Sequence, residues 1–153
     1  MDVASFSKLS GVELQPSRVV QPKKILVVED DKNMTVLLGK ALLDASGDAE
    51  IHWATSLEQA VTNLIQNTDI NQKVPYDLVI ADIFLEGNGT GLDFLKVINR
   101  TYPKIPFLVI SSLAPEIVTE ALSAEVKPNV TYLRKPFLYF QCREKIKVLL
   151  TEL

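Results

Sequence analysis

The sequence predicts a doubly wound α/β fold in which helices cover both faces of a five-stranded parallel sheet. From Lys23 onward, short β-branched runs alternate with stretches of helical period, which is typical of repeated β-α units. The runs are mostly continuous rather than alternating with polar residues, as expected for strands buried on both faces. A length of 153 residues suits one domain with a substantial core.

The chain divides into a short amino-terminal region and one folded domain. Residues 1–22 mix polar and apolar positions, contain prolines at 16 and 22, and keep no regular period. We expect a flexible extension there and the folded domain at residues 23–153.

Five short apolar runs are the expected strands, in chain order. They are Ile25–Val28, Ile51–Ala54, Leu78–Ala81, Phe107–Ile110 and Val130–Leu133. Each is followed by apolar residues three and four positions apart, which predicts an amphipathic helix after every strand. The five stripes are Met34/Leu37/Leu38/Ala41/Leu42, Leu57/Ala60/Val61/Leu64/Ile65, Leu92/Leu95/Ile98, Ile117/Val118/Ala121/Leu122 and Cys142/Ile146/Leu149/Leu150/Leu153. Ser56 and Gln59 have the spacing of a capping box before the second helix.

Composition excludes several classes of function. The net charge of −3 argues against broad electrostatic binding to nucleic acid or to anionic membranes. One cysteine, Cys142, and one histidine, His52, are too few for a zinc site, a disulfide framework or an oriented Cys–His nucleophile. No apolar run reaches the ~18–20 residues of a membrane span, and the amino terminus has no apolar signal region. We therefore expect a soluble, cytoplasmic protein.

Polar side chains gather where the expected strands end. Glu29, Asp30 and Asp31 follow the first strand, Asp82 the third, Ser111 and Ser112 the fourth, and Arg134 and Lys135 the fifth. The carboxyl ends of parallel strands form the functional edge of a doubly wound sheet, so these groups should converge. Converging carboxylates repel unless a cation compensates, and Mg²⁺ accepts such ligands while leaving positions for phosphate oxygens. The pattern favours a site for a phosphoryl group, with Asp82 as the nucleophile.

Four segments carry a family resemblance. ILVVEDD, LVIAD, FLVISS and YLRKPF, at the ends of the first, third, fourth and fifth strands, resemble the receiver domain of two-component response regulators in order, spacing and residue type. The resemblance extends over about residues 23–153. It implies the five-stranded (βα)₅ flavodoxin-like receiver fold.

The resemblance implies roles around the acceptor. Asp82 corresponds to the phosphoacceptor, Asp30 to the direct Mg²⁺ ligand, and Glu29 to the acidic partner that reaches the ion through water. The backbone carbonyl of Phe84 would complete the metal's protein ligands, and Asp31 falls outside the site.

Further roles concern the phosphoryl group and the switch. Lys135 would pair with the phosphoryl group, and the Lys135–Pro136 peptide would be cis so that the amine points at Asp82. Ser111 corresponds to the switch hydroxyl, and Tyr132 to the switch aromatic that moves inward.

The implied function is signalling rather than enzymatic turnover. A histidine kinase or a histidine phosphotransfer protein would phosphorylate Asp82 with Mg²⁺ as cofactor, and an output protein of unknown identity would respond. The face formed by the fourth helix, fifth strand and fifth helix would change, and could mediate a homodimer. Neither nucleic acid nor a membrane is an expected partner.

Other interpretations of single residues remain open. Asp30 or Asp31 could cap the first helix, and Ser111 or Ser112 could cap the fourth. Lys135 could be a solvated surface lysine.

Tyr132 could belong to the core, while His52 and Trp53 have the character of packing residues and receive no function. The chain could be a degenerate receiver that works as a phosphorylation-independent scaffold. A haloacid-dehalogenase-type phosphatase is disfavoured, because its general-acid aspartate would stand where this chain has Phe84.

One segment departs from the usual receiver pattern, and one connection is longer than is common between a helix and a strand. After Asp82, position 86 is Glu rather than proline and the expected glycine comes one residue late, at Gly91, which indicates a one-residue insertion. We expect the glycines there to allow positive φ. The connection Asn67–Pro75 is longer than usual, and is either a solvated loop or a partner-specific insertion.

The resemblance also bears on the lifetime of a phosphorylated state. The side chains expected to flank an attacking water are Phe84 and Leu113, and neither can orient water by hydrogen bonding. We therefore expect a long-lived aspartyl phosphate.

Overall fold

The computed structural model describes residues 20–71, 74–83, 90–122 and 130–151. Its strands are β1 (Lys24–Val28), β2 (Glu50–Ala54), β3 (Leu78–Asp82), β4 (Phe107–Ser111) and β5 (Val130–Arg134). Its helices are α2 (Lys32–Ser46), α3 (Leu57–Asn67), α4 (Gly91–Thr101), α5 (Pro115–Leu122) and α6 (Tyr139–Thr151). Each predicted strand is confirmed and is one residue longer than predicted. Of the expected extension 1–22, only residues 20–22 lie within the described part.

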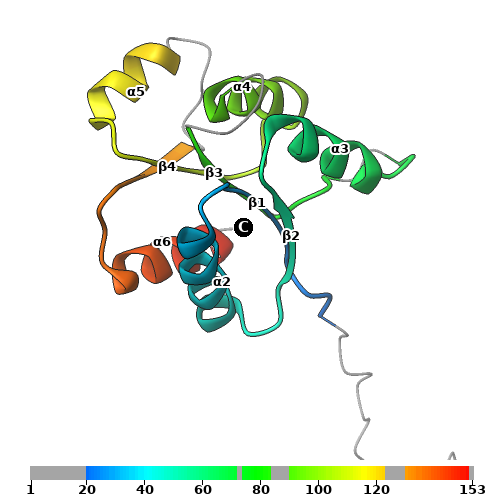
Figure 1. Ribbon diagram of the computed structural model, residues 1–153. Helices are drawn as coiled ribbons and strands as arrows, with labels where there is room; N and C mark the ends of the chain where they lie inside the picture. Colours follow the sequence, from blue (N-terminus) through cyan, green and yellow to red (C-terminus); the bar gives the residue numbers. More distant parts are fainter. Residues whose placement is uncertain (1–19, 72–73, 84–89, 123–129, 152–153) are drawn as a thin grey trace, which may run out of the picture.

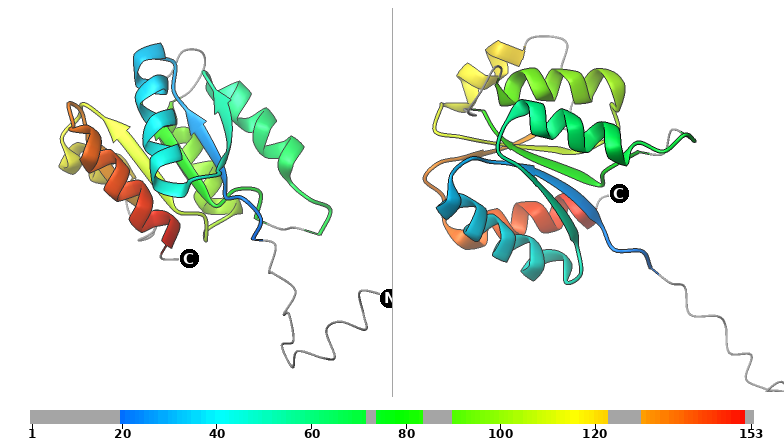
Figure 2. Two further views of the ribbon diagram at one scale, coloured as in Figure 1. Left: turned by 90° about the horizontal axis from the view of Figure 1, so that it is seen from below. Right: turned by 45° about the vertical axis from the view of Figure 1, so that its right-hand side comes forward.

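The five strands form one parallel sheet in the order β2-β1-β3-β4-β5. Helices α2 and α6 cover one face, and α3, α4 and α5 cover the other (Figures 1 and 2). The chain leaves β1 towards β2 on one side and continues through β3, β4 and β5 on the other. The strand order therefore reverses beside β1, and the carboxyl ends of β1 and β3 lie next to each other at this point. The predicted doubly wound fold is confirmed.

The sheet is buried on both faces by two apolar clusters. Leu26, Val28 and Val79 face α3 and α4, whereas their neighbours Ile25 and Val27 face α2 and α6. Because successive side chains of a strand point to opposite faces, burial on both sides requires apolar residues at every position. Each fully buried Leu, Ile or Val side chain contributes about 1.5–3 kcal/mol to this core.

Side-chain caps mark the beginnings of α2, α3 and α4. Asp31 caps α2 by accepting hydrogen bonds from the amides of Asn33 and Met34, at 2.8 and 3.2 Å. Asp31 therefore has the capping role that the sequence left open.

The predicted capping box at α3 is only half correct. Ser56 accepts from the Gln59 amide at 3.2 Å, but the Gln59 side chain accepts from Thr55, one residue before the cap. A complete capping box, with Thr90 and Asp93 as partners, instead begins α4.

Within the described residues, no helix is long and apolar enough to cross a membrane.

Candidate functional site

Three carboxylates meet where β1 and β3 end. One oxygen from each of Glu29, Asp30 and Asp82 lies within 4.8 Å of the other two. Val28 of β1 is paired in register with Ala81 of β3, so the residues that follow them emerge side by side. Within the described residues no other acidic side chain joins this cluster. The adjacent strand ends thus bring together residues that are more than fifty positions apart in the chain.

Glu29 is the most buried member of the cluster, with 1% of its surface exposed. Its Oε1 accepts hydrogen bonds from the backbone amides of Asp30 and Asp31, at 3.1 and 3.0 Å. Its Oε2 is buried and has no hydrogen-bond partner. Burial raises the pKa of Glu29 from 4.5 to about 7, with a smaller contribution from the charge of Asp82, against the lowering effects of the Asp31 amide and of Lys135.

Lys135 brings a positive charge to the carboxylates. Its Nζ lies 2.6 Å from Oδ2 of Asp82 and 3.6 Å from Oε2 of Glu29. Burial alone would lower the pKa of Lys135, but the hydrogen bond to Asp82 and the nearby negative charges raise it above its usual value. The Lys135–Pro136 peptide is cis. Both the cis bond and the direction of the amine agree with the prediction, and the interpretation of Lys135 as a solvated surface residue is wrong.

Ser111 and Tyr132 lie on the neighbouring strands β4 and β5. Ser111 is fully buried, and its hydroxyl accepts a hydrogen bond from the Leu113 amide at 3.1 Å. The Tyr132 hydroxyl donates to the carbonyl of Ser111 at 3.0 Å and also hydrogen-bonds the carbonyl of Leu113. The backbone amide of Lys135 donates to the same Ser111 carbonyl at 2.8 Å. Ser111, Tyr132 and Lys135 are thus linked through one peptide group.

The suggestion that Ser111 or Ser112 caps the next helix is wrong. Helix α5 begins at Pro115, and the amides of Ile117 and Val118 donate to the carbonyl of Ala114. Neither serine is at the capping position.

Gly91 has a different role from the one predicted. Gly47 is the only glycine with positive φ among the described residues, so Gly91 is not needed for a left-handed turn. A Cβ at Gly91 would lie 2.0 Å from the backbone oxygen of Asp82, and the Gly91 amide donates to the Ile83 carbonyl at 2.9 Å. Gly91 is required because the start of α4 passes directly against the end of β3. Phe84, whose carbonyl was the fourth expected metal ligand, lies outside the described residues, as do Gly87 and Gly89.

Comparison with known proteins identifies the family. A family model of the response regulator receiver domain matches residues 25–147, so the chain belongs to this family. Receiver domains of this kind serve two-component signalling, generally as signalling modules that work with histidine kinases and output domains.

The similar sequences are longer proteins. A Rickettsia conorii protein named as an NtrX-like response regulator is 27% identical over 128 residues, which is 83% of this chain and 24% of that protein. A Rickettsia felis protein of the same name is 27% identical over 114 residues, which is 74% of this chain and 22% of that protein. The chain therefore spans about a quarter of the length of the curated relatives that it matches.

Solved receiver structures have the same fold. The phosphorylated cyanobacterial phytochrome response regulator RcpA is 25% identical, with a TM-score of 0.65 over 84% of this chain and 91% of that one. The receiver domain of NtrX from Brucella abortus is 23% identical, with a TM-score of 0.66 over 82% and 97%. The Mn²⁺-bound form of response regulator Rcp1 is 24% identical, with a TM-score of 0.64 over 84% and 91%. For the last two the likeness is one of fold.

Proposed function

We propose that this receiver domain, residues 23–153, accepts a phosphoryl group on Asp82 from a histidine kinase or a histidine phosphotransfer protein and thereby changes its binding to an output partner. The observation that carries the proposal is the position of Asp82, which lies beside two further carboxylates and accepts a hydrogen bond from Lys135 at 2.6 Å. The structure of RcpA is described as phosphorylated, which supports the same chemistry here.

The residues at this edge fit a magnesium ion. Mg²⁺ prefers carboxylate oxygens, and oxygens of Glu29, Asp30 and Asp82 lie within 4.8 Å of one another. The buried Glu29 Oε2 without a hydrogen-bond partner is an acceptor that a metal-bound water would satisfy. Asp30 and Asp82 would hold the ion directly, with the Phe84 carbonyl, and Glu29 would act through water. The bound ion would supply positive charge against the oxygens of the phosphoryl group. Rcp1, which is described in a Mn²⁺-bound form, supports a divalent cation.

The transfer itself requires an in-line attack by Asp82. A carboxylate oxygen of Asp82 forms the new O–P bond while the P–N bond of the donor phosphohistidine breaks, and that electron pair returns to the imidazole nitrogen. The Lys135 ammonium, already paired with Asp82, would hold a phosphoryl oxygen by a charge-assisted hydrogen bond.

Ser111 is the group that would couple phosphorylation of Asp82 to a structural change at the surface. Its hydroxyl is held by the Leu113 amide, and its carbonyl by Tyr132 and Lys135. A hydroxyl that turned towards the phosphoryl group would give up the Leu113 amide, and a shift of Ser111 and Leu113 would reach Tyr132 through the two carbonyls that its hydroxyl bonds. The surface of α5, β5 and α6 would then change, which makes it the proposed site for the output partner or for a second copy of the chain.

Phosphorylation can be tested by Phos-tag electrophoresis after incubation with acetyl phosphate and Mg²⁺. We expect a slower band in the wild type and none in Asp82→Asn or without Mg²⁺. Asp30→Ala should also prevent phosphorylation while leaving the fold intact, because it removes one of three mutually repelling charges.

Asp31→Asn is the matched control. It removes a neighbouring carboxylate that lies outside the cluster, and asparagine caps helices as well as aspartate does. We expect it to phosphorylate at the wild-type rate. A wild type that gives no shifted band under these conditions would favour a phosphorylation-independent scaffold, and an Asp30→Ala protein that phosphorylates normally would remove Asp30 from the metal site.

A further inference from the structure

A second polar network lies at the opposite end of the sheet from Asp82, around the only histidine of the chain. His52 Nε2 lies 2.7 Å from Oε1 of Glu50, and His52 Nδ1 lies 2.9 Å from the hydroxyl of Tyr76. Tyr76 is 1% exposed, and its hydroxyl is also 3.3 Å from the carbonyl of Asn63 and 3.1 Å from Nδ2 of Asn67. The network joins the edge strand β2 to the last turn of α3 and to the segment that enters β3.

Counting donors shows that this network has two states. The Glu50 carboxylate can only accept, so His52 keeps its proton on Nε2 and can titrate only at Nδ1. In neutral His52, Nδ1 must accept the single hydrogen of the Tyr76 hydroxyl. In protonated His52, Nδ1 donates to Tyr76 instead, and the hydroxyl hydrogen is released to the Asn63 carbonyl, which also accepts from Asn67 Nδ2 at 2.8 Å.

We propose that His52, Glu50 and Tyr76 form a pH-responsive tie, in which protonation of His52 moves the Tyr76 hydrogen bond onto the carbonyl of Asn63 and holds the end of α3 more tightly. The tie is independent of the phosphoryl chemistry proposed above.

The groups around His52 favour two defined states. Glu50 stays ionised, because the hydrogen bond from His52, followed by the charge of Lys24, lowers its pKa. Lys24 of β1 is paired in register with Glu50, while His52 itself is paired with the apolar Leu26. Burial raises the pKa of Tyr76 to about 12, so its hydroxyl keeps its hydrogen. The partners that α3 contributes to the network, Asn63 and Asn67, are uncharged.

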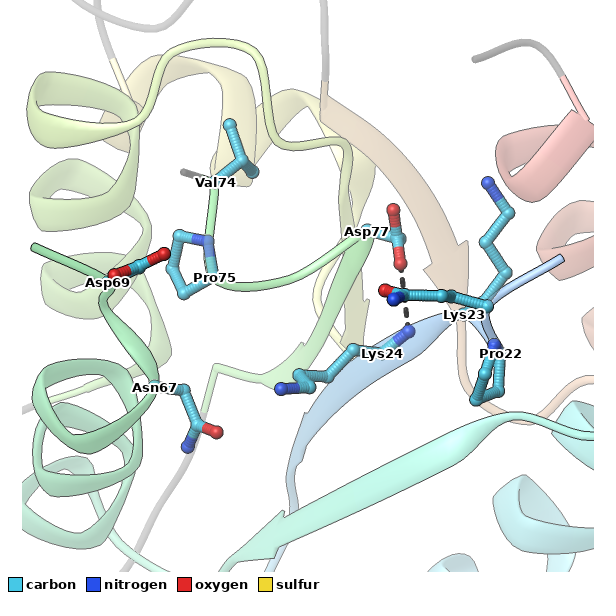
Figure 3. A pocket seen from close by; sticks show the side chains of 9 residues that line it. Pro22, Lys23, Lys24, Asn67, Asp69, Val74, Pro75 and Asp77 are labelled. Atoms are coloured by element: carbon cyan, nitrogen blue, oxygen red, sulfur yellow. Dashed lines mark hydrogen bonds between the residues drawn. The ribbon is translucent and has the colours of Figure 1, made fainter. Parts of the chain in front are cut away.

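The same hydrogen-bond network borders a pocket at the amino-terminal end of β1. The pocket has a volume of about 380 Å³, and Figure 3 shows Asn67, Asp69, Val74 and Pro75 along one wall. Asn67 belongs both to this wall and to the Tyr76 network. The connection between α3 and β3, whose length was unusual in the sequence, is therefore anchored at its start by Asn67, which hydrogen-bonds the Tyr76 hydroxyl.

The test combines nitrogen NMR of the His52 ring with amide hydrogen exchange in the unphosphorylated full chain. When His52 takes up a proton, that proton should appear on Nδ1 while Nε2 stays protonated throughout. After correction for intrinsic exchange rates, the amides of Leu64–Asn67 should be about 2–10-fold better protected at pH 5.5 than at pH 7.5, the range expected for one added hydrogen bond.

Two tyrosine variants separate the tie from general effects of pH. Tyr76→Phe should abolish the pH dependence of protection. Tyr102→Phe is the matched control, because it removes a hydroxyl that bonds Thr68 in the same connection at 2.9 Å but does not touch His52. It should keep the pH dependence. A neutral His52 protonated on Nδ1, equal protection at both pH values, or an unchanged pH dependence in Tyr76→Phe would each overturn the proposal, and the first two require no variant.

Discussion

Glu29→Gln is the substitution that most clearly tests the electrostatics of the carboxylate cluster. Glutamine keeps Oε1 and therefore keeps the two hydrogen bonds from the amides of Asp30 and Asp31. It replaces the buried Oε2, which accepts no hydrogen bond and lies 3.6 Å from the Lys135 ammonium, by an amide that carries no charge. We expect the variant to be more stable than the wild type in the absence of divalent cations.

The size of the gain follows from the pKa of Glu29. The folded state raises this pKa from 4.5 to about 7, mainly by burial, so it holds the proton more strongly than the unfolded chain does. The favourable contribution is complete below pH 4.5 and is lost as the pH rises through 7. At pH 8 the buried carboxylate costs about 3 kcal/mol, which glutamine removes. At pH 5 the gain shrinks to about 1 kcal/mol.

Urea unfolding at pH 5 and pH 8, with a chelator present, measures both values. Glu144→Gln is the control, because Glu144 is 52% exposed and its neutralisation should change stability by less than about 0.5 kcal/mol at either pH. A Glu29→Gln variant that is destabilised at pH 8, or that gains equally at both pH values, would refute the argument.

Three further predictions concern two glycines and the lifetime of the phosphorylated state. Gly91→Ala should lose about 1–3 kcal/mol or more and impair phosphorylation, because its Cβ would stand 2.0 Å from the Asp82 carbonyl oxygen; urea unfolding and Phos-tag gels measure this. Gly39→Ala should gain about 0.5–1 kcal/mol in urea unfolding, because its Cβ would meet the Trp53 ring at an ordinary 3.5 Å. The wild-type aspartyl phosphate should be long-lived, and Leu113→Glu should hasten autodephosphorylation by up to about 100-fold, whereas loss within seconds in both proteins would contradict this.

The central strands β1, β3 and β4 were predictable because they are buried on both sides and so carry an unbroken apolar signal, which the partly exposed edge strands β2 and β5 carry in weaker form. The charged residues at the ends of β1, β3 and β5 were predictable once the strands were, since the ends of the strands determined their positions. Their convergence required only the rule that parallel strands end at one edge of the sheet. Glu29, Asp82 and Lys135 therefore came together as the sequence indicated.

Interactions that depend on the packing of distant segments were not predictable. The sequence suggested a turn at Gly91, whereas its role comes from the approach of α4 to the end of β3. His52 was interpreted as a packing residue, because nothing local shows that Tyr76, twenty-four positions later, places its hydroxyl on Nδ1. The capping box at Thr90 was missed because the acceptor three residues later is Asp93 rather than the more usual Glu or Gln.

The central claim is that Asp82 is the phosphoacceptor, and trapping the acyl phosphate tests it most directly. Hydroxylamine attacks the carbonyl carbon of an aspartyl phosphate, expels phosphate and leaves a hydroxamate on the side chain that carried it. After phosphorylation with Mg²⁺ and treatment with hydroxylamine, peptide mass spectrometry should find the hydroxamate on Asp82 and none on Glu29, Asp30 or Asp31. A hydroxamate on one of these neighbours, or on no residue of a protein that gives the shifted band, would contradict the account.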